Sequence, residues 1–365
     1  MGRTGARQDA GLELTRTRGQ PLPEAPGGAQ ATSLPGIEEC DPAQFAEIIR
    51  DRDEPAVFRG LVGDWPIVAA SRRSIDDLAA YLTSLDRGAN VRAFVGEPDS
   101  AGRFFYTDRL EGLNFHVSET RFAQLIGTLV QFQRKGTTTP IYMGSTPTSK
   151  ILPDFAKANP LAEIEKRGGP PRVWIGNNSR VAAHFDEADN VACVVSGTRR
   201  FTLFPTEQVA NLYIGPIERT VAGRPISLVD LTNPDLVRYP RFGEALRHAR
   251  TAELGPGDAI YIPSLWWHGV EATGPLNVLV NYWWQDEPAD ADSPLHAIGH
   301  GLLAVGHLAE RKRERWRVLF DHYVFRENGD PAEHMPEHVR GILAPSTSEL
   351  RGLIRQFLIQ KLTGR

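Results

Sequence analysis

Cysteine is scarce in this sequence, with only Cys40 and Cys193 among 365 residues. Two cysteines cannot build the disulfide framework of small secreted proteins, so a reducing compartment, the cytoplasm, is the expectation. Apolar runs long enough to cross a bilayer are also missing, and we expect no membrane association. The 41 basic and 45 acidic residues nearly cancel, which leaves a formal net charge of −4. A chain-wide nucleic-acid footprint is therefore not indicated.

The chain divides into three regions by composition. Residues 1–35 hold arginine, glycine and proline but few large apolar side chains, which predicts a disordered N-terminal tail. Residues 36–290 mix strand and helix patterns and are long enough for one large domain. Residues 291–365 change to helical patterns and predict a helical extension. Its expected buried side chains are Leu302, Leu303, Leu308, Trp316, Leu319, Phe320 and Tyr323.

The sequence His184-Phe185-Asp186, followed 82 residues after Asp186 by His268, is the most informative pattern. Residues two apart on a β-strand point to the same face, so His184 and Asp186 can reach one metal ion. A histidine from a distant strand would complete the set. Two histidines and one carboxylate on one face of an octahedron leave three positions open, as in non-haem Fe(II) oxygenases.

The flanking residues predict the strands that would carry this triad. An apolar run over 191–195 is followed by Ser196-Gly197-Thr198, for which we predict a turn, and then by a returning strand over 199–205. Gly255-Pro256-Gly257-Asp258 predicts a second turn before a strand that ends at Pro263. Residues 276–284 predict another strand, because they are rich in β-branched and aromatic side chains.

The segment from about residue 140 to 286 resembles the JmjC-type, cupin-like Fe(II)- and 2-oxoglutarate-dependent oxygenases, most of all the factor-inhibiting-HIF-like hydroxylase subgroup. The residues that carry this resemblance are His184-Phe185-Asp186-Glu187, Asn190, Gly197-Thr198-Arg199-Arg200, Leu203-Phe204-Pro205, Trp266-Trp267-His268 and Asn281-Tyr282-Trp283. The resemblance implies a mainly β fold with helices: a double-stranded β-helix (jelly-roll or cupin) core with an N-terminal α/β region and the C-terminal helical extension.

The resemblance also implies a cofactor and a cosubstrate. His184, Asp186 and His268 would bind Fe(II) and form the catalytic centre. Arg199 stands where the family usually has a lysine, and a guanidinium suits the distal carboxylate of 2-oxoglutarate.

The other cosubstrate-binding positions implied by the resemblance are Tyr142, Asn190, Asn281 and Trp283. Val181 replaces a threonine of the family, which removes one hydrogen bond to the cosubstrate. Thr202 on the neighbouring strand is a candidate to replace that bond. Asn190 and Asn281 also fit polar ends of core strands, and Tyr142 also fits a packing role.

The implied function is hydroxylation of a protein side chain, an RNA or a small molecule, with succinate and CO2 as co-products. Two alternatives stay open: a cupin enzyme that does not use 2-oxoglutarate, and a non-catalytic, metal-binding regulatory protein. Fe, Mn, Co and Zn all suit these ligands. The resembled hydroxylase dimerises through C-terminal helices, so a homodimer is expected here.

A second set of histidines also matches metal-ligand spacing. His296 and His300, like His334 and His338, stand four residues apart in predicted helical sequence. That spacing can bind zinc, but the HExxH pattern and a third ligand are missing. We therefore interpret these histidines as surface or packing residues.

Overall fold

The computed structural model of the protein describes residues 34–221 and 223–364. The disordered tail predicted for residues 1–35 lies outside the described residues, apart from its last two positions. Among the described residues, no helix is both long and apolar enough to span a membrane. Cys40 and Cys193 are both free thiols.

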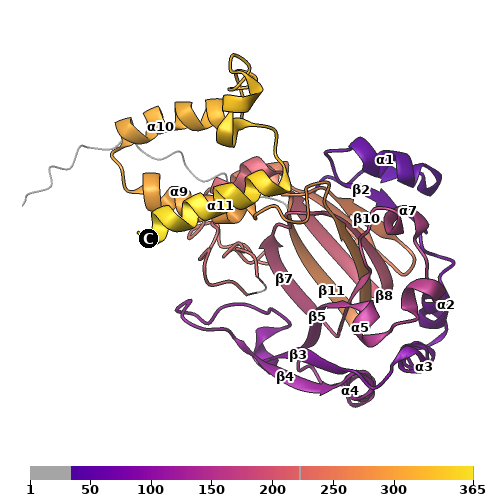
Figure 1. Ribbon diagram of the computed structural model, residues 1–365. Helices are drawn as coiled ribbons and strands as arrows, with labels where there is room; N and C mark the ends of the chain where they lie inside the picture. Colours follow the sequence, from indigo (N-terminus) through magenta and orange to yellow (C-terminus); the bar gives the residue numbers. More distant parts are fainter. Residues whose placement is uncertain (1–33, 222, 365) are drawn as a thin grey trace, which may run out of the picture. The chain divides into compact units, whose positions relative to one another are not determined.

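An 11-stranded mixed sheet forms the centre of the fold (Figure 1). Its strands are β1 Glu39–Cys40, β2 Ala56–Phe58, β3 Asn90–Gly96, β4 Phe115–Arg121, β5 Ile141–Pro147, β6 Arg172–Gly176, β7 Ser179–His184, β8 Asp189–Phe204, β9 Arg250–Leu254, β10 Ala259–Ile262 and β11 Trp267–Trp284. The order is β1-β2-β10-β8-β11-β6-β5-β3-β4, while β7 pairs with β11 and β9 with β8. The pairs are antiparallel except β1–β2. The expected cupin-type β core with added helices is confirmed.

Helices of the N-terminal region cover one side of this sheet (Figure 1). The helices before β9 are α1 Phe45–Asp51, α2 Pro66–Arg73, α3 Ile75–Leu85, α4 Phe122–Lys135, α5 Thr148–Ile151, α6 Phe155–Ala158, α7 Ala162–Glu165 and α8 Phe242–His248. Ser74 caps α3 by accepting a hydrogen bond from the Asp77 amide. The α4 helix begins at Phe122, directly after Thr120 and Arg121, which pair with β3 in the sheet.

Two apolar cores lie on the two faces of the sheet. The larger core joins the outer sheet face to α2, α3 and α4, with Val191, Cys193 and Val195 of β8 in it. The smaller core contains Ala192 and Val194 from the opposite face of β8. Phe201 and Leu203 belong to this smaller core too, although their numbers are odd. The side-chain direction of β8 therefore reverses between residues 195 and 201.

The reversal occurs at Gly197, and it shows that the turn predicted at Ser196-Gly197-Thr198 is wrong. β8 continues through these residues, and the β8–β11 register shifts between Thr273 and Val278. Gly197 has a φ of 78°, which side chains other than glycine adopt only with strain. Just before Gly197, Val194 and Ser196 lie opposite the consecutive residues Leu279 and Val278, so β8 has one extra residue there. Such a β-bulge moves the following side chains to the other face.

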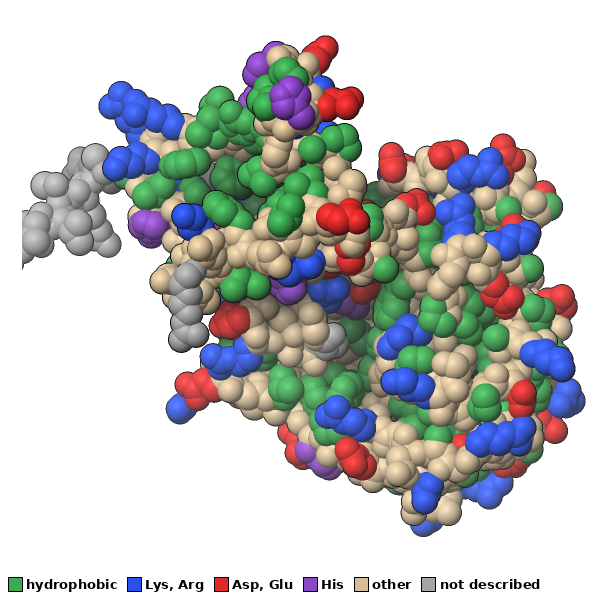
Figure 2. All heavy atoms as spheres, viewed as in Figure 1, with side chains coloured by type: hydrophobic (Ala, Val, Ile, Leu, Met, Phe, Trp, Pro, Cys, Tyr) green, Lys and Arg blue, Asp and Glu red, His purple; other side chains and the backbone are tan. Residues whose placement is uncertain are grey.

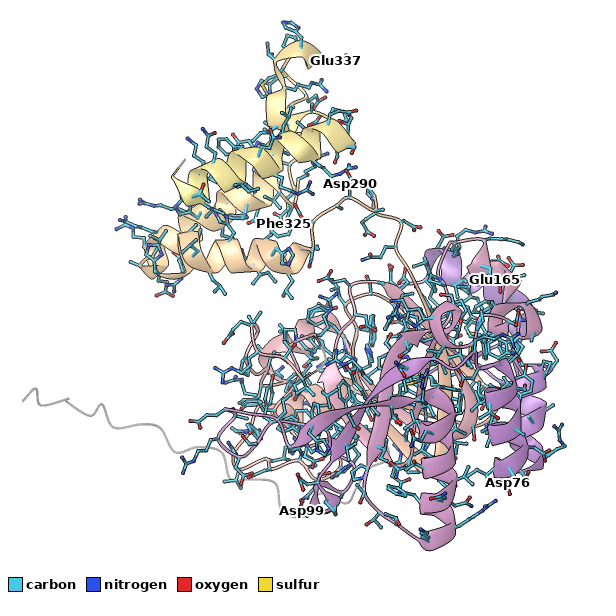
Figure 3. The ribbon with its side chains drawn as sticks, turned by 60° about the horizontal axis from the view of Figure 1, so that its bottom comes forward. Asp76, Asp99, Glu165, Asp290, Phe325 and Glu337 are labelled. Atoms are coloured by element: carbon cyan, nitrogen blue, oxygen red, sulfur yellow. The ribbon has the colours of Figure 1, made fainter. Side chains whose placement is uncertain are left out.

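The C-terminal helices are α9 Pro294–Gly301, α10 Glu310–Tyr323 and α11 Ser348–Thr363. A π-helical turn over Leu302–Gly306 follows α9 directly. Figure 3 labels Asp290 in the connection before α9, and Phe325 just after α10. The prediction that this segment buries its large apolar residues is wrong: Leu302, Leu303, Trp316 and Tyr323 are exposed, as are Leu319 and Phe320, and Leu308 is only half-buried. Their helical spacing is present, but nothing within residues 34–221 and 223–364 covers them.

Substitution of Gly197 by alanine is predicted to lower the free energy of unfolding by about 3 kcal/mol. The cost has two parts, since a methyl group would force a left-handed conformation and would overlap the Asn277 side chain. Gly136 is the matched control, because its φ is 65° but no atom lies within 4 Å of the added methyl group. Gly136→Ala should cost only about 1 kcal/mol in urea unfolding. Equal losses in the two variants would contradict the role given to the Asn277 contact.

Candidate metal centre

Three side chains, from two neighbouring strands and the loop after one of them, converge in one pocket. His184 ends β7 and lies directly opposite His268 in the β7–β11 pair. The two imidazole rings are 4.3 Å apart between centroids, and His268 Nε2 lies 3.6 Å from Asp186 Oδ2. The potential ligand atoms of all three residues lie within 4.8 Å of one another. The predicted convergence of the three residues is present, but Asp186 lies in the loop just after β7 and not on the strand that carries His184.

Backbone carbonyls fix which nitrogen of each imidazole faces this cluster. His184 Nδ1 lies 3.0 Å from the Ala182 carbonyl oxygen, and His268 Nδ1 lies 3.0 Å from that of Trp266. A carbonyl oxygen only accepts, so Nδ1 carries the proton and donates it. The lone pair of Nε2 is then free to bind a metal, as in most metal-binding histidines.

The electrostatic setting keeps the donors in the form that a metal needs. Burial, with a smaller contribution from His184, lowers the pKa of His268 to about 4, so its imidazole is neutral near pH 7. The indole Nε1 of Trp283 donates a 3.0 Å hydrogen bond to Asp186 Oδ2. This bond holds the carboxylate toward the two histidines without any metal.

A pocket of about 180 Å³ surrounds the cluster. Its lining includes His184, Asp186, His268, Arg199, Tyr142, Asn190, Asn281 and Trp283, which are all the site residues expected from the sequence. Aromatic rings form one wall, with Tyr142 stacked on Trp174 at 5.8 Å and Phe104 at 5.6 Å from Tyr142. The sequence did not identify Phe104 and Phe115 as pocket residues, although the aromatic run at 104–106 marks the segment.

Arg199 brings a positive charge into this largely apolar pocket. The residue is only 3% exposed, and its Nε has no hydrogen-bond partner among the described residues. Burial lowers the pKa of Arg199 to about 10, which leaves the guanidinium charged at neutral pH. Burial raises the pKa of Tyr142, and the charge of Arg199 opposes part of that rise. A buried cation with an unused donor favours an anion in the pocket.

The two asparagines form a chain of hydrogen bonds along the pocket. Trp174 Nε1 donates to Asn281 Oδ1 at 2.7 Å, and Asn281 Nδ2 donates to Asn190 Oδ1 at 3.2 Å. Both asparagines are buried, and the Nδ2 group of Asn190 is left to face the pocket. Val181 lines the pocket, as its alignment implies, but Thr202 does not. Thr202 therefore does not replace the missing threonine, because Arg199 and Phe201 occupy the pocket side of β8.

Glu187, next to the metal-binding Asp186, holds a group of contacts that we did not predict from the sequence. Its side chain accepts hydrogen bonds from Arg224 at 2.9 Å and from Ser293 at 2.6 Å. Arg224 lines the pocket, and Ser293 caps the N-terminus of α9. The only sequence signal was Glu187 itself within the matched motif.

The donor set fits a divalent transition metal. Two imidazoles and one carboxylate suit Fe(II), and Mn, Co and Zn accept the same ligands. Within residues 34–221 and 223–364, His184, Asp186 and His268 are the one group of three such side chains close enough to hold an ion. The histidines at 296, 300, 334 and 338 form no such group, in agreement with their interpretation as surface residues.

Comparison with known proteins agrees with this geometry. The family model of the cupin-like domain matches residues 42–290. The chain belongs to the cupin-like, JmjC-type family. A cupin-like domain therefore contains all the strands that carry the cluster, from β7 to β11.

Curated relatives of this cupin-like protein have different names. It is 35% identical over 288 residues to HSPB1-associated protein 1 of Bos taurus, covering 75% of the chain and 57% of the relative. Lysine-specific demethylase JMJ31 of Arabidopsis thaliana is 35% identical over 188 residues, which cover 51% of the chain and 30% of the relative. tRNA wybutosine-synthesizing protein 5 of Danio rerio is 33% identical over 138 residues, with 38% and 39% covered. The chain thus spans from about a third to just over half of these relatives.

Trp283→Phe is predicted to weaken Fe(II) binding by about 10- to 100-fold. The substitution keeps the aromatic packing but removes the hydrogen bond that orients Asp186. Trp284→Phe is the matched control, because the indole N–H of Trp284 has no partner among the described residues. Anaerobic Fe(II) titration measures both variants. If both variants bind iron like the original protein, Trp283 does not position the ligand.

Proposed function

We propose that this protein is an Fe(II)- and 2-oxoglutarate-dependent oxygenase that hydroxylates its substrate, with succinate and CO2 as co-products. The metal would be held by His184, Asp186 and His268. The distal carboxylate of 2-oxoglutarate would be held by Arg199, with Tyr142, Asn190, Asn281 and Trp283 around the cosubstrate. Bound together, iron and 2-oxoglutarate supply activated oxygen for insertion into a C–H bond. The family match and the two free cysteines agree with an enzyme of the cytoplasm, which belongs to the same proposal.

The charge of the pocket is the observation that carries this proposal. Arg199 contributes +1 and Asp186 contributes −1, while Arg224, also in the lining, is balanced by its ion pair with Glu187. Imidazoles that bind a metal do so in their neutral form and add no charge. A bound Fe(II) ion would raise the total to +2, a large charge for a buried site. The dianion 2-oxoglutarate would return it to zero and give the unpartnered Arg199 Nε an acceptor. A cupin enzyme without this cosubstrate has no such use for a buried arginine.

The walls of the pocket have roles in the same scheme. Rings of Phe104, Tyr142 and Trp174 exclude water from one side, which strengthens the attraction between Arg199 and a carboxylate. The Asn190 and Asn281 chain offers a hydrogen-bond donor within the pocket. Phenol and amide donors help to hold an anion in one orientation while the metal side stays open to oxygen and substrate.

Two substrate classes follow from the names of the relatives. One relative is named as a lysine-specific demethylase and another as a tRNA wybutosine-synthesizing protein. Oxidation of a protein side chain and oxidation of a modified RNA base are therefore the reactions to test first, followed by small molecules. Hydroxylation and demethylation share their first step, because a hydroxylated N-methyl group breaks down to formaldehyde and the free amine.

Anaerobic titration of the Fe(II)-loaded protein with 2-oxoglutarate is the experiment that tests the cosubstrate. We expect a saturable visible charge-transfer band that weakens by at least about tenfold in affinity in Arg199→Ala, since a charge-assisted bond is lost. Arg200→Ala is the matched control, because Arg200 is the next residue in β8 but is exposed. His184→Ala should lose the iron itself.

The outcomes separate the proposal from its alternatives. If the band is unchanged in Arg199→Ala, a residue other than Arg199 binds the distal carboxylate of 2-oxoglutarate. Iron binding without any band would contradict the oxygenase proposal and favour a cupin enzyme that does not use 2-oxoglutarate, or a regulatory protein.

We also propose that two copies of the chain associate through the C-terminal helices. Of the 24 exposed large apolar residues in the described chain, 17 lie between residues 298 and 362. Figure 2 shows many apolar side chains over this segment, in the upper left of the view. In α10, Trp316, Phe320 and Tyr323 repeat at helical spacing and form one apolar stripe. An apolar surface of this extent is typical of an obligate interface.

Sedimentation velocity measurements test this association. We expect a dimer for the original chain and a monomer for the double variant Trp316→Glu and Phe320→Glu, because each buried charge opposes the contact. Arg315→Glu is the control on the same helix, and it should remain dimeric. A monomeric original chain would contradict the proposal.

A further inference from the structure

A second cavity, separate from the metal pocket, lies on the other side of β7. Its volume is about 530 Å³, against about 180 Å³ for the metal pocket. Arg180 of β7 lines this cavity, while its neighbour Val181 lines the metal pocket, as alternation along a strand requires. The remaining walls come from the loop at 100–114 and the segment at 228–239. Asp99, labelled in Figure 3, immediately precedes the first of these loops.

Two half-buried arginines and one aspartate set the charge of this cavity. Asp230 Oδ2 lies 3.8 Å from Arg103 Nη1 and 3.6 Å from Arg180 Nη1, distances too long for hydrogen bonds. Two guanidinium groups and one carboxylate leave a net charge of +1. Asp108, Asp235 and Arg238 also line the cavity, but they are exposed and screened by water. The inner part of the cavity therefore has the charge that matches a single anionic group.

Several polar atoms of this cavity have unused hydrogen-bonding capacity. The buried Nε of Arg180 and the buried hydroxyl oxygen of Ser100 have no partner among the described residues. Arg103 makes only one long hydrogen bond, of 3.4 Å, to the Leu228 carbonyl oxygen. Burial lowers the pKa of Arg103, so its charge is destabilised without an anion. Arg180 Nη1 and Nη2 already donate to Thr232 Oγ1 at 2.7 Å and to the Ser100 carbonyl oxygen at 3.3 Å, so the unmet donor capacity that a ligand would use lies mainly on Arg103.

Flat apolar surfaces lie next to these donors. The Arg103 guanidinium stacks on the Phe105 ring at 3.7 Å, which fixes its plane and leaves its edge free. Tyr106 and Tyr239 add two more rings to the lining. Leu110, also in the lining, is held at a φ of 58°, a strained conformation for a leucine. Rings beside a planar cation favour a ligand with an aromatic or flat apolar part.

Close backbone packing holds this cavity in place. Gly102 has a φ of 82°, and a methyl group there would stand 2.8 Å from the Asn178 carbonyl oxygen. Only glycine lets the loop approach β7 this closely, and the Arg180 amide donates a 2.7 Å hydrogen bond to the Gly102 carbonyl oxygen. The arginines are thus presented by a fixed loop and a sheet strand.

We propose that this cavity is a second binding site, for a ligand that carries one carboxylate beside an aromatic or flat apolar group. The carboxylate would bind the edge of the Arg103 guanidinium beside the positive charge of Arg180, and the flat group would pack on Phe105, Tyr106 and Tyr239. The site does not depend on iron or 2-oxoglutarate. It shares the segment at 104–106 with the metal pocket, because Phe104 lines one cavity while Phe105 and Tyr106 line the other.

Calorimetric titration with hippurate (benzoylglycine) tests the site, since this probe joins one carboxylate to an aromatic ring. We expect saturable binding that is about tenfold weaker in Arg103→Gln, because one charge-assisted bond is lost. Hippuramide, the neutral amide, should bind more weakly than hippurate. Asp230→Asn should bind hippurate more tightly, because the cavity then keeps both positive charges. A gain in affinity cannot come from a misfolded variant.

Two controls locate the probe. Arg200→Gln changes an exposed arginine outside this lining and should leave the affinity nearly unchanged. Arg199→Ala should also leave it unchanged, because Arg199 lines only the metal pocket. Loss of hippurate binding in Arg199→Ala but not in Arg103→Gln would place the probe in the metal pocket and overturn the proposal. Absence of saturable binding, or equal binding of hippuramide, would overturn it too.

Discussion

The reversal of side-chain direction within β8 is the constraint on which the metal pocket depends. The first half of the strand gives Asn190 and Ala192 to the pocket, and the second half gives Arg199 and Phe201. A regular strand would place an even-numbered and an odd-numbered residue on opposite faces. The left-handed conformation of Gly197 removes this conflict, and the shifted register with β11 accommodates it. The positive charge and the metal ligands therefore share one small volume.

The chain itself also arranges the metal ligands before any metal arrives. Backbone carbonyls hold the proton of each imidazole on Nδ1, and the Trp283 indole holds the carboxylate of Asp186. All three restraints come from the sheet: His184 and His268 face each other across β7 and β11, and Trp283 is in β11 as well. Little reorganisation is then needed on metal binding, which favours affinity and a defined geometry.

Sequence patterns predicted the parts of the site that depend on regular structure. The approach of His184 to His268 follows from pairing of distant strands, while Asp186 reaches them from the loop just after β7. Arg199 was named only through the family resemblance, because its position on the pocket side requires the bulge, which we had interpreted as a turn. The prediction that Thr202 replaces the hydrogen bond lost at Val181 was wrong for the same reason. The apolar spacing in α10 predicted a helix correctly, but spacing cannot say whether the covering surface belongs to the same chain. The second cavity is formed by loops, whose course the sequence patterns did not predict.

The contacts of Glu187 have a mechanical consequence for the whole domain. A single carboxylate connects the loop after β7 to Arg224 in the pocket wall and to Ser293 at the start of α9. Rotation of α9 would stretch its bond to Ser293, and any shift of Glu187 would pull on Asp186, the preceding residue, and on Arg224. A displacement of the C-terminal helices would thus reach the metal ligand Asp186 through only two side chains, those of Ser293 and Glu187.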